Sequence, residues 1–314
     1  MSHQRLQHIF AAGRYSLPVT IFLALVCWIV AFMLLPDRPS GGESLAGLLL
    51  YAATGYLLIL LNNAFALIRI RMSVQTMVYF LLVAACPVLH RSIPEAMAAA
   101  LYLPALFMLL YSYQNKHTAE QACYTFMLLS AGSLFYPRLM LFMPLFWVGQ
   151  YMFQSLTAKT FVAGCVGWLL PYWFLLAYAY LTGDMSRFTE PFGELVTFQP
   201  VTERGFLPWE GATLLFLFVL FVVSSIHSLT NGFQDKMRIH VYLQFFVLTT
   251  LFFFIYVLLQ PAQALPMLPF LLINVSVLTG HFVAQSDSRS SNCFVVAVLL
   301  LLFSLFAFNL WTLL

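Results

Sequence analysis

Residues 17–66 read LPVTIFLALVCWIVAFMLL (17–35), PDRPSGGES (36–44) and LAGLLLYAATGYLLILLNNAFA (45–66). Two long apolar runs therefore flank a short segment that is rich in charge, proline and glycine. A helix needs about 20 apolar residues to cross roughly 30 Å of hydrocarbon, and both runs meet that length. The pattern is typical of two membrane-spanning helices joined by a turn at the membrane surface.

The same pattern continues along the rest of the chain, and we predict about eleven transmembrane helices (10–11) on this length criterion. The other spans are expected at 73–89, 95–113, 121–136, 138–157, 160–182, 209–229, 241–259, 264–284 and 292–313. The chain is 62% hydrophobic and 8% charged, which is too apolar for a soluble domain of 314 residues. We expect residues 1–314 to form a single transmembrane domain. Its fold class is an all-α polytopic integral membrane helix bundle with no separate soluble domain.

The boundary between the fifth and sixth spans depends on two residues. Residues 121–157 as a single helix would be about 55 Å long, which is too long for one crossing. Pro137 interrupts a helical backbone, and Arg138 is costly in lipid. We therefore expect a tight hairpin turn at these two residues.

Lysine and arginine orient the chain, because cytoplasmic loops keep more positive charge than exported loops. With a cytoplasmic N-terminus, nine of the fourteen basic residues fall inside: Arg5, Arg14, Arg69, Arg71, Lys116, Lys159, Lys236, Arg238 and Arg289. The outside gathers eight of the eleven acids. The run 17–35 is followed by no small-residue cleavage site, so we expect it to be retained as the first helix. These features predict a multi-pass protein of the bacterial cytoplasmic (inner) membrane, with the N-terminus cytoplasmic and the C-terminus periplasmic.

The longest extracytoplasmic loop is 183–208, and connections of this length are usually functional or disordered. Within it Phe188, Phe192 and Leu195 recur at helical spacing, with charged residues between them. Pro191 counts against a regular helix. We therefore expect a broken surface helix whose apolar stripe lies against the membrane.

The sequence lacks the signatures of several enzyme classes. It has no G-x-x-x-x-G-K-[ST] motif of an ATPase, and no H-E-x-x-H or G-x-S-x-G motif of a metalloprotease or hydrolase. No predicted span carries an acid near its midplane, which disfavours a proton-coupled pump. No basic cluster stands on a soluble face, so no nucleic acid partner is expected. We also expect no cofactor and no metal, except that a transferase would allow a divalent cation.

Charged residues on the predicted outer side are the candidate site. Asp37 and Glu43, in the first outer loop, are the candidate catalytic residues, since a carboxylate there can act as a general base or hold a divalent cation against a lipid diphosphate. Arg38, Arg138 and Arg187 are the candidate phosphate-binding residues, because guanidinium groups pair with phosphate oxygens. Two ordinary alternatives stay open. The loop can be a charged turn that is merely solvated, and the arginines can snorkel toward headgroups.

A set of short motifs carries a resemblance. The motifs are Leu61-Asn62-Asn63, Arg69-Ile70-Arg71, the hairpin Gly132-Ser133-Leu134-Phe135-Tyr136-Pro137, and Gly164 and Gly167 before Pro171. In this order they resemble an uncharacterised family of polytopic inner-membrane proteins of the Bacteroides group, which has no established activity to carry over.

In outline the chain is also similar to multi-span glycosyltransferases that take sugars from polyprenyl phosphate, and to polysaccharide polymerases with a similar helix count. This resemblance implies a polyprenyl-phosphate-linked substrate and an acidic residue in the first outer loop. Asp37 and Glu43 are available there, but the loop has no Asp-x-Asp or Glu-Asp pair. A likeness of fold alone does not assign an activity.

Three functions stay open, and the sequence does not decide whether the chain is an enzyme. The first is a glycosyltransferase-like enzyme at the outer face, in cell-envelope glycan or lipid-carrier metabolism. The second is a non-catalytic membrane subunit of an envelope assembly, with another membrane protein as its partner. The third is a lipid or small-molecule transporter, in which prolines break helices around a cavity. Membrane lipids are expected partners in every case. The prolines in question are Pro87, Pro104, Pro144, Pro171, Pro266 and Pro269.

Overall fold

The computed structural model describes residues 15–35, 40–67, 74–197, 205–230, 237–285 and 289–314. All regular structure in these ranges is helical, and no strand occurs in them. Together with the length and apolar character of its helices, this makes the protein an all-α polytopic helix bundle, as the sequence predicts.

Eight of the helices in the described ranges are long and apolar enough to cross a membrane. They are α2 (Ser16–Leu34), α3 (Gly41–Phe65), α5 (Ile93–Tyr111), α8 (Ala158–Thr182), α10 (Pro208–Thr230), α11 (Met237–Leu259), α12 (Ala264–Gln285) and α13 (Arg289–Leu313). Each of them coincides with a span predicted from the sequence. The third, fifth and sixth predicted spans hold shorter helices, which are α4 (Val74–Ala84), α6 (Ala119–Phe135) and α7 (Met143–Met152).

Prolines explain where α4 and α6 end. After α4 the chain enters a 3-10 helix, η1 (Pro87–Arg91), because proline has no N–H to continue an α-helix. After α6 the chain is extended at Tyr136 and forms a second 3-10 helix, η2 (Pro137–Phe142). The predicted hairpin is therefore present. Phe126 and Trp147, on its two arms, stack with their ring centroids 4.6 Å apart.

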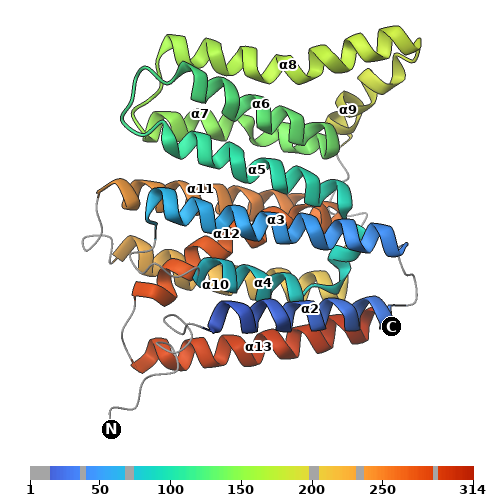
Figure 1. The fold of residues 1–314 in the computed structure, drawn as a ribbon, viewed down its shortest axis with the longest axis vertical. Helices are drawn as coiled ribbons and strands as arrows, with labels where there is room; N and C mark the ends of the chain where they lie inside the picture. The colour runs from blue at the N-terminus through green and yellow to red at the C-terminus, as the bar shows by residue number, and fades with distance from the viewer. Residues whose placement is uncertain (1–14, 36–39, 68–73, 198–204, 231–236, 286–288) are drawn as a thin grey trace. The chain divides into compact units, whose positions relative to one another are not determined.

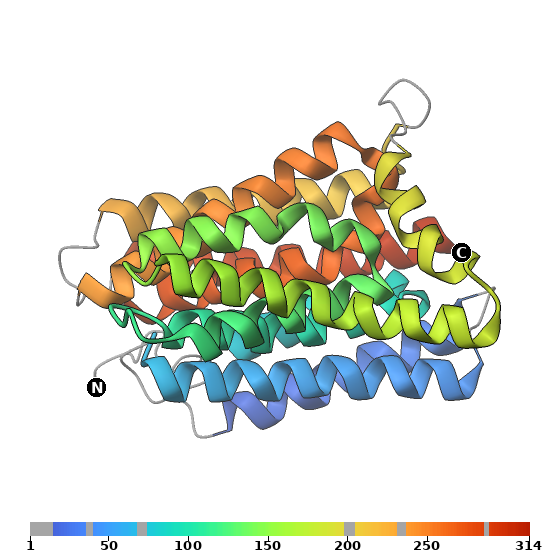
Figure 2. The same cartoon turned by 90° about the horizontal axis from the view of Figure 1, so that it is seen from above.

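Contacts divide the chain into two compact units. Unit 1 comprises Met1–Ile93 and Arg204–Leu314, and unit 2 comprises Pro94–Glu203. In unit 1 the central helix is α12, which is almost entirely buried and packs against α4, α10 and α11 (Figures 1 and 2). Both α2 and α3 pack against α4, and α13 packs against α10.

Polar side chains tie the helices of unit 1 together. Ser224 of α10 donates a hydrogen bond to Thr279 of α12 at 3.2 Å. The amide of Asn309, on α13, donates to the carbonyl of Ala85 at 2.9 Å and to the hydroxyl of Thr213 at 3.0 Å. Ala85 follows the last residue of α4, so Asn309 satisfies a carbonyl that the break at Pro87 leaves without a helical partner.

Unit 2 is built from α5 to α8, the connecting η2, and α9 (Ser186–Val196). The backbones of α6 and α8 approach closely at Gly167, where an added Cβ would collide with the carbonyl oxygen of Cys123. Small residues at helix interfaces allow such an approach in membrane proteins. Ser133 and Tyr172 join the same two helices through their hydroxyl groups at 2.8 Å.

Helix α9 lies within the long 183–208 segment and continues through Pro191. None of its residues is buried, and its apolar side faces the unit. The ring of Phe192 lies 5.2 Å from the ring of Tyr172 on α8, and Phe188 lies 5.3 Å from Phe192. The aromatic residues at helical spacing thus hold α9 to unit 2.

Candidate functional site

Of the two candidate catalytic carboxylates, the structure describes one, Glu43. Asp37, with its neighbour Arg38, lies outside the described residues. Glu43 lies in the first turn of α3 and forms a capping box with Ser40. The backbone N–H of Ser40 donates to the Glu43 carboxylate at 2.9 Å, and the N–H of Glu43 donates to the Ser40 hydroxyl at 3.2 Å. The Glu43 carboxylate therefore stabilises the start of α3.

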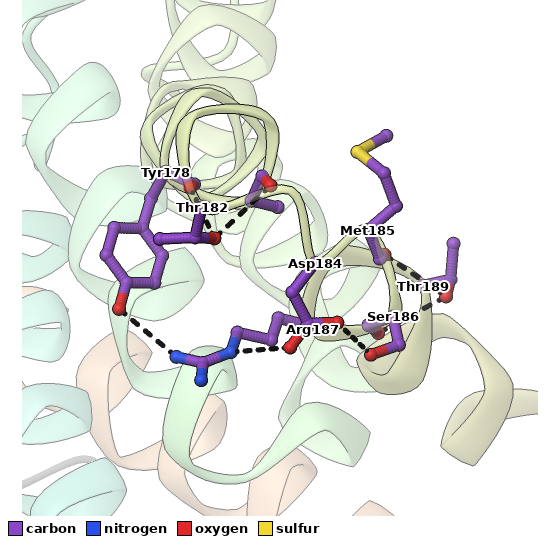
Figure 3. Close-up of polar contacts among 8 residues, drawn as sticks. Tyr178, Thr182, Asp184, Met185, Ser186, Arg187 and Thr189 are labelled. Carbon is purple, nitrogen blue, oxygen red and sulfur yellow. Dashed lines mark hydrogen bonds and ion pairs between the residues drawn. The ribbon is translucent and has the colours of Figure 1, made fainter.

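Arg187 lies at the corner between α8 and α9 (Figure 3). Its Nε donates to Asp184 at 2.9 Å, and its Nη1 donates to the hydroxyl of Tyr178 at 3.1 Å. The Ser186 hydroxyl also donates to Asp184. That hydroxyl and, next, the Arg187 guanidinium lower the pKa of Asp184, while Asp184 raises the pKa of Arg187. Both side chains are exposed and stay charged at neutral pH.

Arg138 has a different partner. It follows Pro137 at the turn before α7, and its Nη2 donates to the carbonyl of Thr197 at 3.3 Å. Thr197 is the residue after α9, whereas Arg187 is near the beginning of α9. Ten residues of helix separate those two positions by about 15 Å. The structure therefore does not bring Arg138 and Arg187 together at a shared phosphate site.

A second group of polar side chains is buried in unit 1, and we call it the His90 cluster. Its members are Trp28 of α2, Ser44 and Tyr51 of α3, and His90 and Ser92 of the connection between α4 and α5. The rings of His90 and Trp28 lie with their centroids 3.7 Å apart, and Trp28 and Tyr51 are 5.8 Å apart. All five side chains are buried, with His90 only 1% exposed.

Hydrogen bonds give one of the two ring nitrogens of His90 a partner. The indole N–H of Trp28 is a donor only, and it donates to the Ser44 hydroxyl at 3.3 Å. The Ser44 hydroxyl also shares a hydrogen bond of 3.1 Å with His90 Nδ1, and its direction depends on the tautomer of the ring. Nε2 is buried and has no hydrogen-bond partner among the described residues.

Burial lowers the pKa of His90 to about 4. The imidazole is therefore neutral at pH 7, and a neutral imidazole can accept or donate a proton in a reaction or bind a polar group. On the other side of the cluster, the hydroxyls of Tyr51 and Ser92 lie 3.4 Å apart, and Ser92 also donates to the carbonyl of Leu89 at 3.3 Å. The cluster thus joins α2, α3 and η1 and leaves one polar atom, Nε2, unused.

An apolar cavity of about 330 Å³ adjoins the cluster at Trp28 and Tyr51. It lies between α2 and α3, with Phe80 and Val83 of α4 also in its lining. Both α2 and α3 pack on α4. The side chain of Trp28 joins α2 to α3 through its contacts with Ser44 and Tyr51. We call the region where α2 ends and α3 begins the α2–α3 end of unit 1.

The His90 cluster is not among the sites predicted from the sequence. Its members come from three segments, and Ser44 and His90 are 46 residues apart. One local signal was present: a histidine two residues before Ser92 and three after Pro87, at the end of an apolar run. The described residues contain no group of three His, Cys, Asp or Glu side chains that could hold a metal ion. Comparisons of the chain with protein-family models, with curated proteins and with solved structures found no match.

Proposed function

We propose that this protein binds a lipid-linked substrate in the outer leaflet of a bacterial inner membrane and acts on it as a glycosyltransferase-like enzyme of cell-envelope glycan or lipid-carrier metabolism. The observation that carries the proposal is the position of the His90 cluster beside an apolar cavity in unit 1. An amphipathic lipid needs both parts, an apolar wall for its chain and a few polar groups for its head.

In the proposed reaction the substrate is a polyprenyl-phosphate-linked sugar. A hydroxyl oxygen of the acceptor forms the new glycosidic bond while the bond between sugar and phosphate breaks. The hydroxyl proton passes to a general base, and the phosphate leaves with its lipid. Asp37 and His90 are our candidates for this general base, and they are tested first. Glu43 is not, because its carboxylate already caps α3.

The proposal also places the protein in the membrane with its N-terminus cytoplasmic and its C-terminus periplasmic, so that the α2–α3 end faces the periplasm. The positive-inside rule supports this orientation. Fusions at the C-terminus test it: alkaline phosphatase should be active there and green fluorescent protein dark. The opposite result would place the C-terminus in the cytoplasm, either by a reversed orientation or by a helix count that is lower by one.

The transfer reaction is tested in cells. Depletion of the protein should cause a polyprenyl-linked intermediate to accumulate, as measured by mass spectrometry of lipid extracts. Depleted cells are then complemented with His90→Asn or with Asp37→Asn. The variant that lacks the general base should fail to complement, although its level in the membrane equals that of the wild type. An unchanged pattern of lipid-linked intermediates after depletion would remove the enzyme proposal.

A second candidate, a non-catalytic subunit of an envelope assembly, is favoured by the contacts of three predicted site residues. Glu43, Arg138 and Arg187 all make bonds that hold helix ends or a helix corner. This candidate predicts a stoichiometric membrane partner after purification in a mild detergent. A monomer in that experiment, together with accumulated intermediates in depleted cells, would leave the enzyme proposal as the better one.

A further inference from the structure

The cavity beside the His90 cluster is elongated along the helices. On α3 its lining extends from Leu48 to Ile59, and on α2 from Ile21 to Trp28. At 1.5 Å per residue these stretches are about 16 Å and 10 Å long. Both stretches lie around the middle of their helices, and the length of the cavity is close to the roughly 15 Å thickness of one leaflet of the hydrocarbon core.

The lining and the opening of the cavity are suited to hydrocarbon. Most lining side chains are aliphatic or aromatic, and the indole N–H of Trp28 is already bonded to Ser44. Leu49 and Tyr56 line the cavity and are each 61% exposed, so it opens on the outside of the helices. The outer surface of a membrane-spanning helix contacts lipid. Apolar cavities do not retain water, so this cavity is suited to a hydrocarbon chain of the surrounding lipid.

The size of the cavity depends on one contact between α3 and α4. A Cβ on Gly55 would collide with the ring of Phe80, so glycine at this position lets the ring lie against the α3 backbone. Phe80 is also part of the cavity lining. The position of its ring therefore sets how much space remains between α2 and α3.

We propose that the cavity is a binding site for a single hydrocarbon chain of a membrane lipid, with the lipid head at the His90 cluster, and that Phe80 seated on Gly55 limits the chain that fits. The volume supports one chain, since pockets for small ligands begin at about 300 Å³. This inference rests on the proposed function for the identity of the lipid head, but chain binding requires no transfer reaction.

Two neighbouring alanines provide a matched test. Ala52 lines the cavity, and Ala53 is the next residue of α3, is exposed, and is not part of the lining. Purified protein in lipid nanodiscs is irradiated with a lipid that carries a photoactivatable diazirine on its chain, and labelled peptides are identified by mass spectrometry. Ala52→Phe should lower labelling of the α2, α3 and α4 peptides at least fivefold, whereas Ala53→Phe should stay within twofold of wild type.

Two probes identify the source of the chain. One is a single-chain polyprenyl phosphate and the other is a two-chain phosphatidylglycerol, each carrying the diazirine. An isoprenoid chain is supported if only the polyprenyl phosphate probe labels the protein and unlabelled polyprenyl phosphate prevents this labelling. Displaceable labelling by phosphatidylglycerol supports an acyl chain of an ordinary phospholipid. Labelling that neither lipid displaces, and that is equal in both alanine variants, means boundary lipid only and overturns the proposal.

The role of Phe80 has its own variants. Phe80→Ala enlarges the cavity and should shift the preferred probe toward longer or branched chains. Gly55→Ala pushes the ring into the cavity and should lower labelling several-fold, whereas Gly211→Ala should leave it unchanged. Gly211 is a fair control because it is also helical and an added Cβ there meets only the Cβ of Phe206, at 3.9 Å. An unchanged chain preference in Phe80→Ala would overturn the assignment of Phe80.

The outcomes separate this inference from the proposed function. Displaceable labelling that Ala52→Phe abolishes, in a protein whose depletion leaves lipid-linked intermediates unchanged, would keep the chain site and remove the transferase. Accumulated intermediates with no specific labelling would do the reverse.

Discussion

The imidazole ring of His90 lies on the indole ring of Trp28, with centroids 3.7 Å apart and planes inclined by 30°. His90 belongs to the short 3-10 helix η1 after α4, and Trp28 belongs to α2. The stack therefore holds η1 against α2. The same contact places the neutral, buried imidazole against Trp28, which lines the apolar cavity.

The stability of unit 1 should depend on pH through His90. Its pKa in the folded protein is about 4, below the value of about 6.5 for an unfolded chain, because burial disfavours the charged form. The unfolded state then takes up the proton first, so stability is complete above about pH 6.5 and falls as the pH drops toward 4. The melting temperature in detergent should fall by several degrees between pH 7 and pH 5. His90→Phe, which keeps a ring on Trp28, should lose part of that dependence, and an identical pH profile would contradict the assignment.

Two substitutions at Glu43 separate capping from catalysis. Glutamine can still accept the hydrogen bond from the Ser40 N–H, so Glu43→Gln should keep the capping box, whereas Glu43→Ala should lower stability by about 1 kcal/mol. If Glu43 only caps α3, the Gln variant complements depleted cells fully. Loss of complementation by Glu43→Gln at unchanged melting temperature would restore Glu43 as the general base.

Gly167→Ala should destabilise unit 2. Its Cβ would collide with the carbonyl oxygen of Cys123, a backbone atom that cannot rotate away. Forcing α6 and α8 apart should cost about 1–3 kcal/mol, the usual range for overpacking. The measurement is thermal unfolding in detergent. Gly193→Ala on α9 is the control, because an added Cβ there meets no atom within 4 Å. Equal melting temperatures for the two variants would show that the helices adjust freely.

Arg187→Ala should leave the melting temperature nearly unchanged, since Arg187 and Asp184 are both exposed and exposed ion pairs contribute little. It should raise the pKa of Asp184 toward its ordinary value, because one of the interactions that favours the carboxylate is lost. Carbon NMR of labelled aspartate measures this shift. A loss of activity in this variant would then be due to substrate binding, and Arg187→Lys tests whether charge alone is sufficient.

Asn309→Leu should destabilise unit 1 by about 1–3 kcal/mol, because it leaves the carbonyl of Ala85 without its donor. Ser304→Ala, on the same helix, should have little effect, as the Ser304 hydroxyl is exposed and bonds only within α13. Thr213→Val removes the second acceptor. Combined with Asn309→Leu it should cost less than the sum of the single changes, and strict additivity of the melting shifts would argue against a shared bond.

The sequence predicts most of the fold, because membrane crossing depends on local properties. Run length and apolar character predict the eight long helices found in the described part of the chain, and the pair Pro137 and Arg138 predicts the hairpin. The short length of α4 was harder to predict from the sequence. Its residues are as apolar as those of the other spans, and its end depends on Pro87 together with a donor supplied by Asn309.

The candidate site was harder to predict for a physical reason. Sequence reasoning finds charged residues, because charge is unusual in so apolar a chain. The three charged candidate residues that the structure describes hold helix ends and a corner; they are Glu43, Arg138 and Arg187. Asp37 and Arg38 remain predictions. The buried group with an unused polar atom is uncharged, and its members Ser44 and His90 meet only after α3 and α4 have packed.

The bond from Asn309 to Ala85 links residues 224 positions apart. A ribosome delivers helices to the membrane in order, so α4 is synthesised long before its donor exists. An unsatisfied backbone carbonyl is costly in hydrocarbon. Until α13 is made, the carbonyl at the end of α4 therefore has to be hydrogen-bonded by water or by another donor. Once α13 is present, Asn309 takes over this hydrogen bond. A helix made early in translation is completed by a residue that is made 224 positions later.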